Sequence, residues 1–229
     1  MHLAILSDIH EDYENLLKIV AKAEARGFDK LICLGDISGF SLPYYKYEKS
    51  RNASACLTLL REKCDIIIVG NHDLHAAGID PELPDIIKCQ DTWQHELDLD
   101  PGYSEEDISF LATLPFYDIL TTPMGNILFS HYIYPNLTGF VKGLNSREKE
   151  FQAHFAFMRE HNCSLSFTGH AHPKGFYKVH PRGFKHYRNR GIKITTFPAL
   201  IGIPPATRNQ YQRSFGIFDT ISRKLQVFK

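Results

Sequence analysis

The chain has 229 residues, of which 43% are hydrophobic and 23% charged. This composition is that of an ordinary globular protein and excludes a disordered, collagenous or coiled-coil chain as an overall description. The 26 Lys and Arg residues balance the 26 Asp and Glu residues, so the net charge is zero and no global field attracts the protein to nucleic acid or an anionic membrane.

We expect a soluble, cytoplasmic protein that forms a single domain over residues 1–229. Asp8 interrupts the N-terminal apolar segment before it reaches the length of a signal-peptide core, about 7 to 15 residues. The apolar runs are far shorter than the roughly 18 residues of a membrane span. The 5 cysteines are widely spaced without a CxxC pair, which favours free thiols in a reducing compartment. Neither a repeat nor a low-complexity linker divides the chain.

The N-terminal part alternates short apolar runs with amphipathic stretches. Residues 3–6, 31–34 and 66–69 are predicted to be buried strands. The first predicted helix has an apolar stripe formed by Leu16, Ile19, Val20 and Ala23, and the second spans residues 55–63. Because right-handed crossovers make such strands parallel, the polar residues that follow each strand are expected at one sheet edge. Ligands bind at that edge in open α/β sheets.

The second half is less regular. Ser104 and Asp107 predict a capping box at the start of a helix. Residues 127–129 and 165–167 are predicted strands, with a helix through Phe151, Phe155 and Met158 between them. The last third is predicted to supply antiparallel strands to a second sheet, at residues 176–179, 192–197, 215–218 and 225–228.

Five polar blocks follow predicted strands: Asp8-Ile9-His10, Gly35-Asp36, Gly70-Asn71-His72-Asp73, Ser130-His131 and Gly169-His170-Ala171-His172. A single block is weak evidence, since short acidic turns after strands are commonly caps or solvated loops. Alternate histidines at a strand end, however, aim two imidazoles into one pocket. Asp and His are donors that Zn, Mn, Fe and Ni accept, and the lack of Cys argues against a closed thiolate site. A carboxylate shared by two ions would organise in-line attack on phosphorus, and Asp36 is the candidate.

In this order the five blocks resemble the calcineurin-like metallophosphoesterase superfamily, especially its small single-domain bacterial and archaeal phosphodiesterases, over residues 3 to 172. The resemblance implies an α/β fold, namely a four-layer α/β/β/α sandwich of two mixed sheets flanked by helices, with a dinuclear metal centre between the sheet edges. It implies that one metal is held by Asp8, His10 and His172, that the other is held by Asn71, His131 and His170, and that Asp36 is shared. His72 matches the catalytic histidine of the family.

The resemblance further implies a hydrolase acting on phosphomonoesters or phosphodiesters through a hydroxide that bridges two divalent ions, with Mn, Fe, Zn or Ni as candidates. Metal binding lowers the pKa of water from 15.7 to about 7, which provides hydroxide near neutral pH. His72 would protonate the leaving oxygen or stabilise its charge. Asp73 is assigned to the catalytic set as a residue that orients His72, with a cap of the next turn as the alternative.

Two features are considered for substrate binding. Tyr132 follows His131 where many small relatives have glycine, which makes the pocket wall bulkier. Residues 174–193 contain 7 Lys or Arg and 4 aromatic residues but no Asp or Glu. They predict either a surface for a nucleotide or single-stranded nucleic acid, with Arg182, Arg188 and Arg190 as contacts, or a solvated hairpin. Residues 40–51 form either a lid beside the metals or a packed loop.

The expected substrate is a small phosphate ester or a nucleotide, without a membrane partner. Two alternatives stay open at this point. One is a binding scaffold that uses the same fold without catalysis, because a fold alone does not determine function. The other is a nuclease that holds a strand with residues 174–193, which predicts nucleic-acid affinity that falls with salt.

Overall fold

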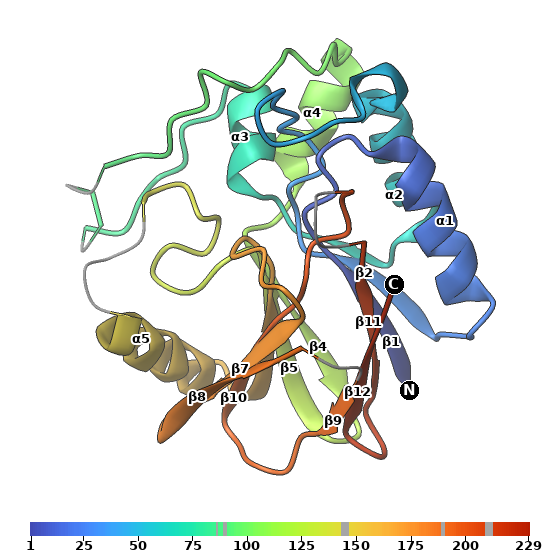
Figure 1. The fold of residues 1–229 in the computed structure, drawn as a ribbon. Helices are drawn as coiled ribbons and strands as arrows, with labels where there is room; N and C mark the ends of the chain where they lie inside the picture. Colours follow the sequence, from blue (N-terminus) through green and yellow to red (C-terminus); the bar gives the residue numbers. More distant parts are fainter. Residues whose placement is uncertain (86, 89–90, 143–146, 189–190, 209–212) are drawn as a thin grey trace.

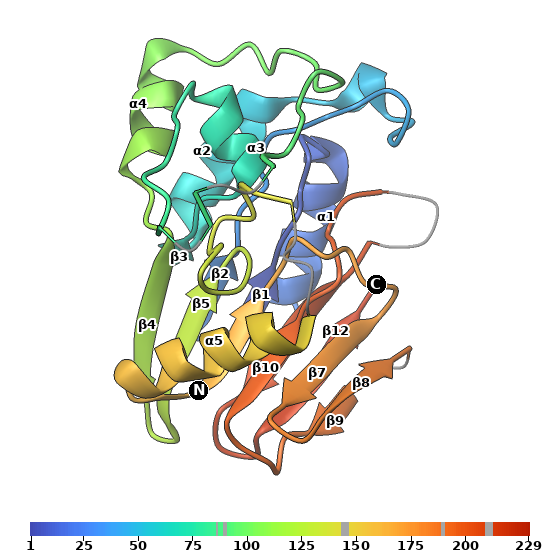
Figure 2. The same ribbon diagram turned by 90° about the vertical axis from the view of Figure 1, so that its left-hand side faces the viewer.

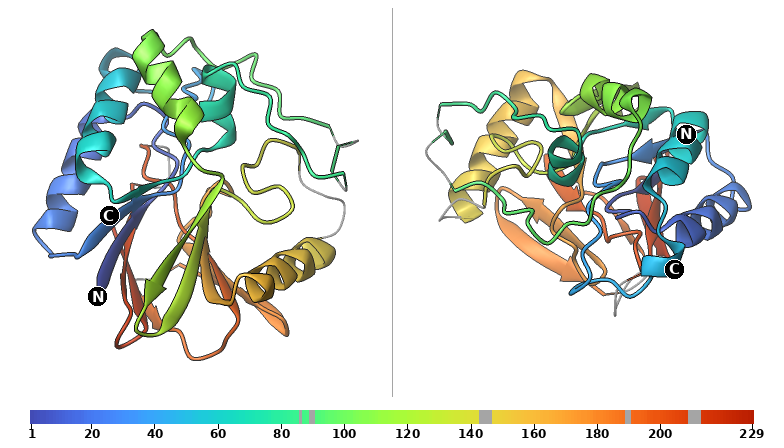
Figure 3. Two further views of the ribbon diagram at one scale, coloured as in Figure 1. Left: turned by 180° about the vertical axis from the view of Figure 1, so that it is seen from behind. Right: turned by 90° about the horizontal axis from the view of Figure 1, so that it is seen from above.

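The computed structural model describes the chain except for residues 86, 89–90, 143–146, 189–190 and 209–212. Two mixed sheets lie face to face, and helices cover their outer faces (Figure 1). The four-layer α/β/β/α sandwich that we expected is therefore confirmed. In the view from above in Figure 3, both sheets lie between the blue helix near the N-terminus and the yellow helix of the second half.

The first sheet has the order β3 (Ile66–Ile67), β2 (Lys30–Cys33), β1 (His2–Leu6), β11 (Phe215–Asp219), β12 (Lys224–Phe228) and β9 (Gly191–Lys193). The second sheet has the order β4 (Tyr117–Thr122), β5 (Gly125–Ser130), β6 (Cys163–Thr168), β10 (Ala199–Gly202), β7 (Phe176–His180) and β8 (Gly183–Tyr187). Strands β1, β2 and β3 are parallel to one another, as are β5, β6 and β10, and the other pairs are antiparallel.

Helices α1 (Tyr13–Glu24) and α2 (Ala53–Lys63) cover the first sheet, and α5 (Arg147–Glu160) covers the second. Figure 2 shows α5 lying across the outer face of the second sheet. The short helix α3 (Asn71–Ala76), α4 (Glu105–Thr113) and the 3-10 turn η1 (Glu48–Ser50) lie near the end of the sandwich that follows the parallel strands (Figure 1). They belong to the loops that carry the predicted polar blocks.

Side-chain alternation in the central strands separates three apolar layers. In β1, Leu3 and Ile5 pack between the two sheets, while Ala4 and Leu6 pack against α1 and α2. In β5, Leu128 packs on the α5 side of the second sheet. Because these strands are buried on both faces, they have continuous apolar runs instead of alternating polar residues. This explains why the sequence pattern predicts them correctly.

The sheet membership of the last third differs from our prediction. Strands β11 and β12 join the first sheet, because β11 pairs with β1 in antiparallel register. The predicted strand 192–197 is shorter and becomes β9, also in the first sheet. Phe218 and Leu225 pack in the layer that both sheets share. An apolar pattern directed into this common layer does not distinguish one sheet from the other.

Two further features concern the chain as a whole. None of the helices in the described part of the chain has the length and apolar character needed to cross a bilayer. Four cysteines, Cys33, Cys56, Cys64 and Cys163, are free thiols, in agreement with the expected lack of a disulfide framework among them. Cys89 lies outside the described residues.

His154 is a buried histidine in the interface between α5 and the second sheet. Its side chain is 0% exposed, and its Nδ1 accepts a hydrogen bond of 3.0 Å from the backbone N–H of Tyr134. The other ring nitrogen therefore carries the proton and donates to Ser166 Oγ at 3.0 Å. Burial lowers the pKa of His154 to about 3. The folded protein thus holds a neutral ring that the unfolded chain protonates near pH 6.5.

We expect His154→Gln to reduce the loss of stability in acid. Since the folded pKa lies below the unfolded value, the stabilisation from the neutral ring is complete above pH 6.5 and declines as the pH falls toward 3. Between pH 7.5 and pH 5 the loss due to this residue is about 2 kcal/mol. Urea unfolding should therefore show that the free energy of unfolding of the variant falls by about 2 kcal/mol less than that of the wild type. An equal fall in both proteins would contradict this assignment.

Candidate metal centre and active site

The loops after the parallel strands hold their polar residues in an unusual backbone conformation. Asp8, His10, Asp36, His170 and His172 have positive φ angles of 56°, 48°, 52°, 61° and 42°. Only a few per cent of non-glycine residues adopt this left-handed region. Such strain of about 1–3 kcal/mol per residue persists where surrounding contacts impose it, typically at functional sites. The loops are therefore folded to present these particular side chains.

The side chains of the 7 predicted metal ligands converge into two adjoining groups. The first group is Asp8, His10, Asp36 and His172, and the second is Asp36, His131 and His170; within each group the donor atoms all lie within 4.8 Å of one another. Asn71 extends the second group, because its Oδ1 lies 3.1 Å from His170 Nδ1. Asp36 belongs to both groups, as expected for a shared ligand.

Two histidines are oriented by backbone carbonyls. Nδ1 of His10 donates to the carbonyl of Ser38 at 3.0 Å, and Nδ1 of His131 donates to the carbonyl of Leu34 at 2.7 Å. The neutral tautomer that makes these bonds has its lone pair on Nε2. Carbonyl partners of this kind orient histidines in metal sites in general. The Nε2 atoms of both rings face the donor groups.

The contacts inside the groups fit a cation better than a set of hydrogen bonds. Nε2 of His10 lies 3.1 Å from Nε2 of His172, and Nε2 of His131 lies 3.3 Å from Nδ1 of His170. Two imidazole lone pairs repel each other unless a proton or a cation lies between them. Asp8 Oδ2 is buried and has no hydrogen-bond partner among the described residues. The donor set is thus suited to metal ions.

Glycines allow the backbone to approach the donors closely. A Cβ atom on Gly70 would come within 3.0 Å of the Asp36 carboxylate, and one on Gly139 would come within 3.0 Å of the His170 ring. Real Cβ atoms essentially never make such contacts, so side chains at these two positions would displace the ligands. The donors are confined by backbone and not only by other side chains.

The electrostatic balance of the site favours ionised carboxylates. Burial opposes ionisation of Asp36, but His131 and His72 outweigh it and hold the pKa of this carboxyl well below its ordinary value. Burial likewise opposes protonation of His131, but Asp36, 3.1 Å away, outweighs it and raises the pKa of His131 to about 9. The buried carboxylates therefore need positive charge beside them, which cations at these donors would supply.

His72 lies on α3, which the sequence pattern did not predict. Its backbone N–H donates to Asp36 Oδ1 at 3.1 Å, and its ring Nδ1 lies 2.5 Å from Asp98 Oδ2. His95 Nδ1 lies 3.1 Å from the same oxygen of Asp98. Burial opposes protonation of His72, but Asp36 and Asp98 outweigh it and raise the pKa of the ring. With Nδ1 engaged by Asp98, Nε2 of His72 is the atom left for substrate.

The Asp73 carboxylate caps the first turn of α3. Its Oδ1 accepts from the backbone N–H groups of Ile37 and Ser38 at 2.9 Å, and its Oδ2 accepts from Gly70 N–H at 3.1 Å. These bonds join the loop after β2 to the first turn of α3. Of the two roles considered for Asp73, the structure shows the cap, and the contact with the His72 ring comes from Asp98. The orienting role of Asp73 stays a prediction, since its described hydrogen bonds all go to backbone N–H groups.

A cleft of about 530 Å³ opens over the donor groups. Its walls include Tyr44, Trp93 and Leu97, whose side chains are 66%, 41% and 53% exposed. The Trp93 ring packs edge-on against the His170 ring, with 5.7 Å between ring centroids. Among the described residues that line this cleft there is neither Lys nor Arg. The positive charge that would bind an anion must therefore come from cations held by the donor groups at the floor of the cleft.

The aromatic segment after Asp36 is in part a packed loop, and its role as a lid stays a prediction. Phe40, Tyr45 and Tyr47 form a buried cluster with Leu99 packed against it, so this part is a packed loop. Tyr44 is exposed and lines the cleft.

The predicted substrate contacts are dispersed. The Tyr132 ring lies 4.5 Å from the His170 ring, beside the donor groups. Arg182 lines a separate cavity between α5 and the β7–β8 hairpin, and Arg188 is exposed; neither lines the cleft. Arg190 lies outside the described residues. Neither Arg182 nor Arg188 therefore lies at the metal cleft, and their contact with a nucleotide or nucleic acid stays a prediction.

The fold and the donor groups together define an α/β protein with a metal-binding edge of the phosphoesterase type. A family model for calcineurin-like phosphoesterase matches residues 1–181, and the chain belongs to this family. The resemblance seen in the five polar blocks is thereby confirmed. Phosphoesterases are hydrolases that act on ester bonds, so the expected enzyme class is confirmed at the level of the family.

Known structures support the same fold. A metallophosphoesterase from Sphaerobacter thermophilus superposes with a TM-score of 0.69 over 99% of this chain and 86% of that chain, at 18% identity. The hypothetical protein PH1004 from Pyrococcus horikoshii OT3 superposes with a TM-score of 0.65 over 100% of this chain and 87% of that chain, at 15% identity. In sequence, the uncharacterized protein MJ0912 from Methanocaldococcus jannaschii is 34% identical over 76 residues, which are 33% of this chain and 28% of that protein.

Proposed function

We propose that the protein is a phosphoesterase that uses two divalent metal ions. The observation that carries the proposal is the position of Asp36, which belongs to two groups of donors at once. Asp8, His10 and His172 would hold one ion with Asp36, and Asn71, His131 and His170 would hold the other. Bound there, two ions of Mn, Fe, Zn or Ni would supply Lewis acidity and a hydroxide at neutral pH.

The residues of the chain position the ester and handle the proton of the leaving group. Asp98 accepts a hydrogen bond from Nδ1 of His72 and thereby fixes the plane of the ring. His72 lines the cleft, so its Nε2 is placed to donate a proton to the leaving oxygen of a bound ester. Asp36 also accepts from the backbone N–H of His72, which ties the position of this histidine to the metal centre.

The cleft favours a phosphodiester with an aromatic or nucleobase-bearing substituent. A diester carries one negative charge and a monoester carries up to two, and the described lining offers no Lys or Arg to balance the second. The exposed rings of Tyr44 and Trp93 suit stacking against a flat substituent. The nuclease alternative loses its main support, because the described cleft lining has no basic groove. The scaffold alternative is opposed by the retention of every predicted ligand and of His72.

The proposal predicts metal-dependent hydrolysis with a preference for diesters. Protein reconstituted with Mn²⁺ should retain about two ions per chain and hydrolyse bis(p-nitrophenyl) phosphate faster than p-nitrophenyl phosphate. EDTA should abolish both reactions, and added Mn²⁺ should restore them. Hydrolysis that is insensitive to EDTA would contradict the proposal. Two bound ions without any turnover would instead support the scaffold.

A further inference from the structure

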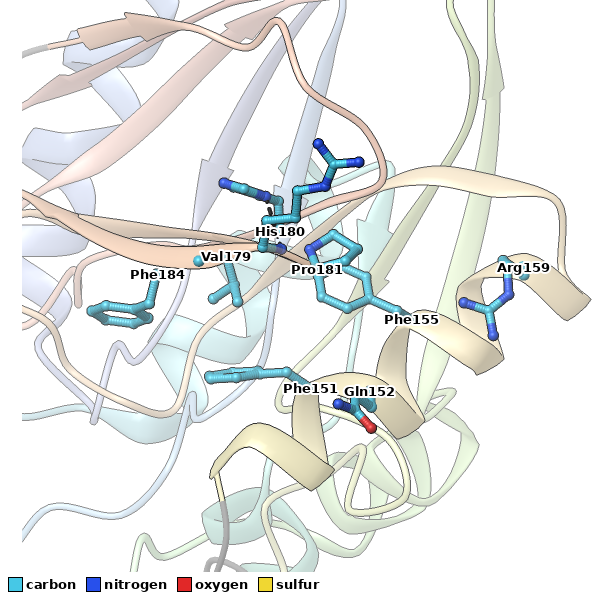
Figure 4. A pocket seen from close by; sticks show the side chains of 10 residues that line it. Phe151, Gln152, Phe155, Arg159, Val179, His180, Pro181 and Phe184 are labelled. Carbon is cyan, nitrogen blue, oxygen red and sulfur yellow. Dashed lines mark hydrogen bonds between the residues drawn. The ribbon is translucent and has the colours of Figure 1, made fainter.

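A second cavity, of about 670 Å³, lies between α5 and the β7–β8 hairpin (Figure 4). Its lining shares no residue with the cleft over the metal donors. Phe151 and Phe155 enter it from one face of α5, and Val179 and Phe184 enter it from the hairpin. The cavity is larger than the metal cleft, and its volume is within the range of about 300–1,000 Å³ that is typical of small-molecule sites.

One part of the cavity wall is apolar, and the cavity is partly open to solvent. Phe155 and Val179 are each 3% exposed and form a floor that is continuous with the packing of α5 on the second sheet. Phe184 is 55% exposed, and its ring lies 6.5 Å from the ring of Phe151 across the cavity. An aromatic pair that opens to solvent beside a buried floor is a typical surface for an apolar ligand.

The polar lining of the cavity consists of two arginines, Arg159 and Arg182, together with Gln152 and His180. Arg159 follows Phe155 by one helical turn on the same face of α5, and Arg182 lies in the hairpin turn. Within the described part of the chain neither guanidinium forms an ion pair, in contrast to Arg61 and Arg208, which pair with carboxylates. The described lining contains no Asp or Glu. The cavity therefore combines apolar side chains with two arginines that no described carboxylate pairs with.

We propose that this cavity binds a small amphipathic anion, an alkyl or aryl chain that carries a single carboxylate or phosphate group. The alkyl or aryl part of the ligand would lie between Phe151, Phe155 and Phe184. Its anionic group would be held by Arg159 and Arg182. Guanidinium groups bind both carboxylates and phosphates through paired N–H donors. This site goes beyond the proposed phosphoesterase function, since it lies apart from the metal donors.

Isothermal titration of the metal-loaded protein tests the proposal with three ligands of equal chain length. Decanoate and decyl phosphate should bind, and decanol should bind more weakly, all below their micellar concentrations. The double variant Arg159→Gln/Arg182→Gln should weaken binding of the preferred anion by about 10-fold or more and leave decanol unchanged. Lys18→Gln on α1 removes an exposed cation elsewhere and should change nothing. Comparison of the two anions identifies which head group the site prefers.

Gly183→Leu tests the location of the site by steric exclusion. Gly183 lines the cavity, does not require a positive φ, and a Cβ atom there meets only the His180 ring at 3.7 Å. The variant should fold normally and lose binding of decanol and of both anions, while metal content and thermal unfolding stay unchanged. Wild-type affinity in this variant would overturn the proposal, as would anions that bind no more tightly than decanol.

Discussion

Replacing Asp36 with asparagine is expected to remove both metal ions and to lower the rate of hydrolysis by on the order of 10³-fold, since several kcal/mol of charge stabilisation are lost. Asp36 is the carboxylate common to the two donor groups, so a neutral amide there weakens both at once. Asparagine keeps an oxygen that can accept the 3.1 Å hydrogen bond from the backbone N–H of His72. The start of α3 should therefore remain in place, which separates the loss of charge from a loss of structure.

The measurement is the metal content after gel filtration together with kcat at saturating Mn²⁺. Asp118→Asn is the matched control, because Asp118 on β4 accepts from the neighbouring backbone N–H of Ile119 and belongs to neither donor group. It should keep two ions and the wild-type rate. If Asp36→Asn retained two ions and full activity, the shared position of Asp36 would have no functional meaning.

The metal donors were predictable because each donor, or the block that contains it, directly follows a strand. A short continuous apolar segment of the sequence identifies each of these strands. Adjacent parallel strands then bring consecutive loops together without further information. The structure shows how this happens for the first two loops, where the backbone N–H groups of Ile9 and His10 donate to the carbonyl of Asp36 at 2.7 and 3.0 Å. The parallel pairing of β1 with β2 therefore accounts for the convergence of Asp8, His10 and Asp36.

Arg182 shows where sequence proximity misleads. It lies ten residues after His172 in the chain, which suggested a place beside the metals. Strand β7 is antiparallel to β10 and runs away from the donor edge, and a five-residue strand advances about 16 Å. The hairpin turn that carries Arg182 is thus at the opposite end of the sheet. The direction of β7 depends on its partner, which a local apolar pattern does not specify.

Asp98 and His95 were missed for a different reason. They lie in a polar segment without helical or strand periodicity, and Asp98 reaches His72 across 26 residues. Contacts of this kind depend on the path of a loop, and neither residue type nor spacing indicates it. The single domain over residues 1–229 stays a prediction; the pairing of β1 with β11 supports it, because the two ends of the chain complete one sheet.

His72→Ala is expected to lower hydrolysis by about 10²- to 10⁴-fold for esters with poor leaving groups. The loss should be much smaller for p-nitrophenyl esters, because p-nitrophenolate leaves without a proton. Metal content should stay at two ions, since the ring of His72 belongs to neither group that shares Asp36. This dependence on the leaving group distinguishes proton donation from metal binding. The measurement is kcat for a series of aryl and alkyl phosphodiesters.

Asp98→Asn is expected to slow the same reactions as His72→Ala, because Asp98 acts on the ester through His72. An amide at this position can no longer hold the Nδ1 proton of His72 with a full negative charge, so the reaction of poor leaving groups should slow while KM changes little. In a His72→Ala background the same substitution should have no further effect, since residues that act as one unit are not additive. His186→Ala on β8, an exposed histidine, should retain the wild-type rate. Independent, additive losses for His72→Ala and Asp98→Asn would show that the 2.5 Å contact between them does not serve catalysis.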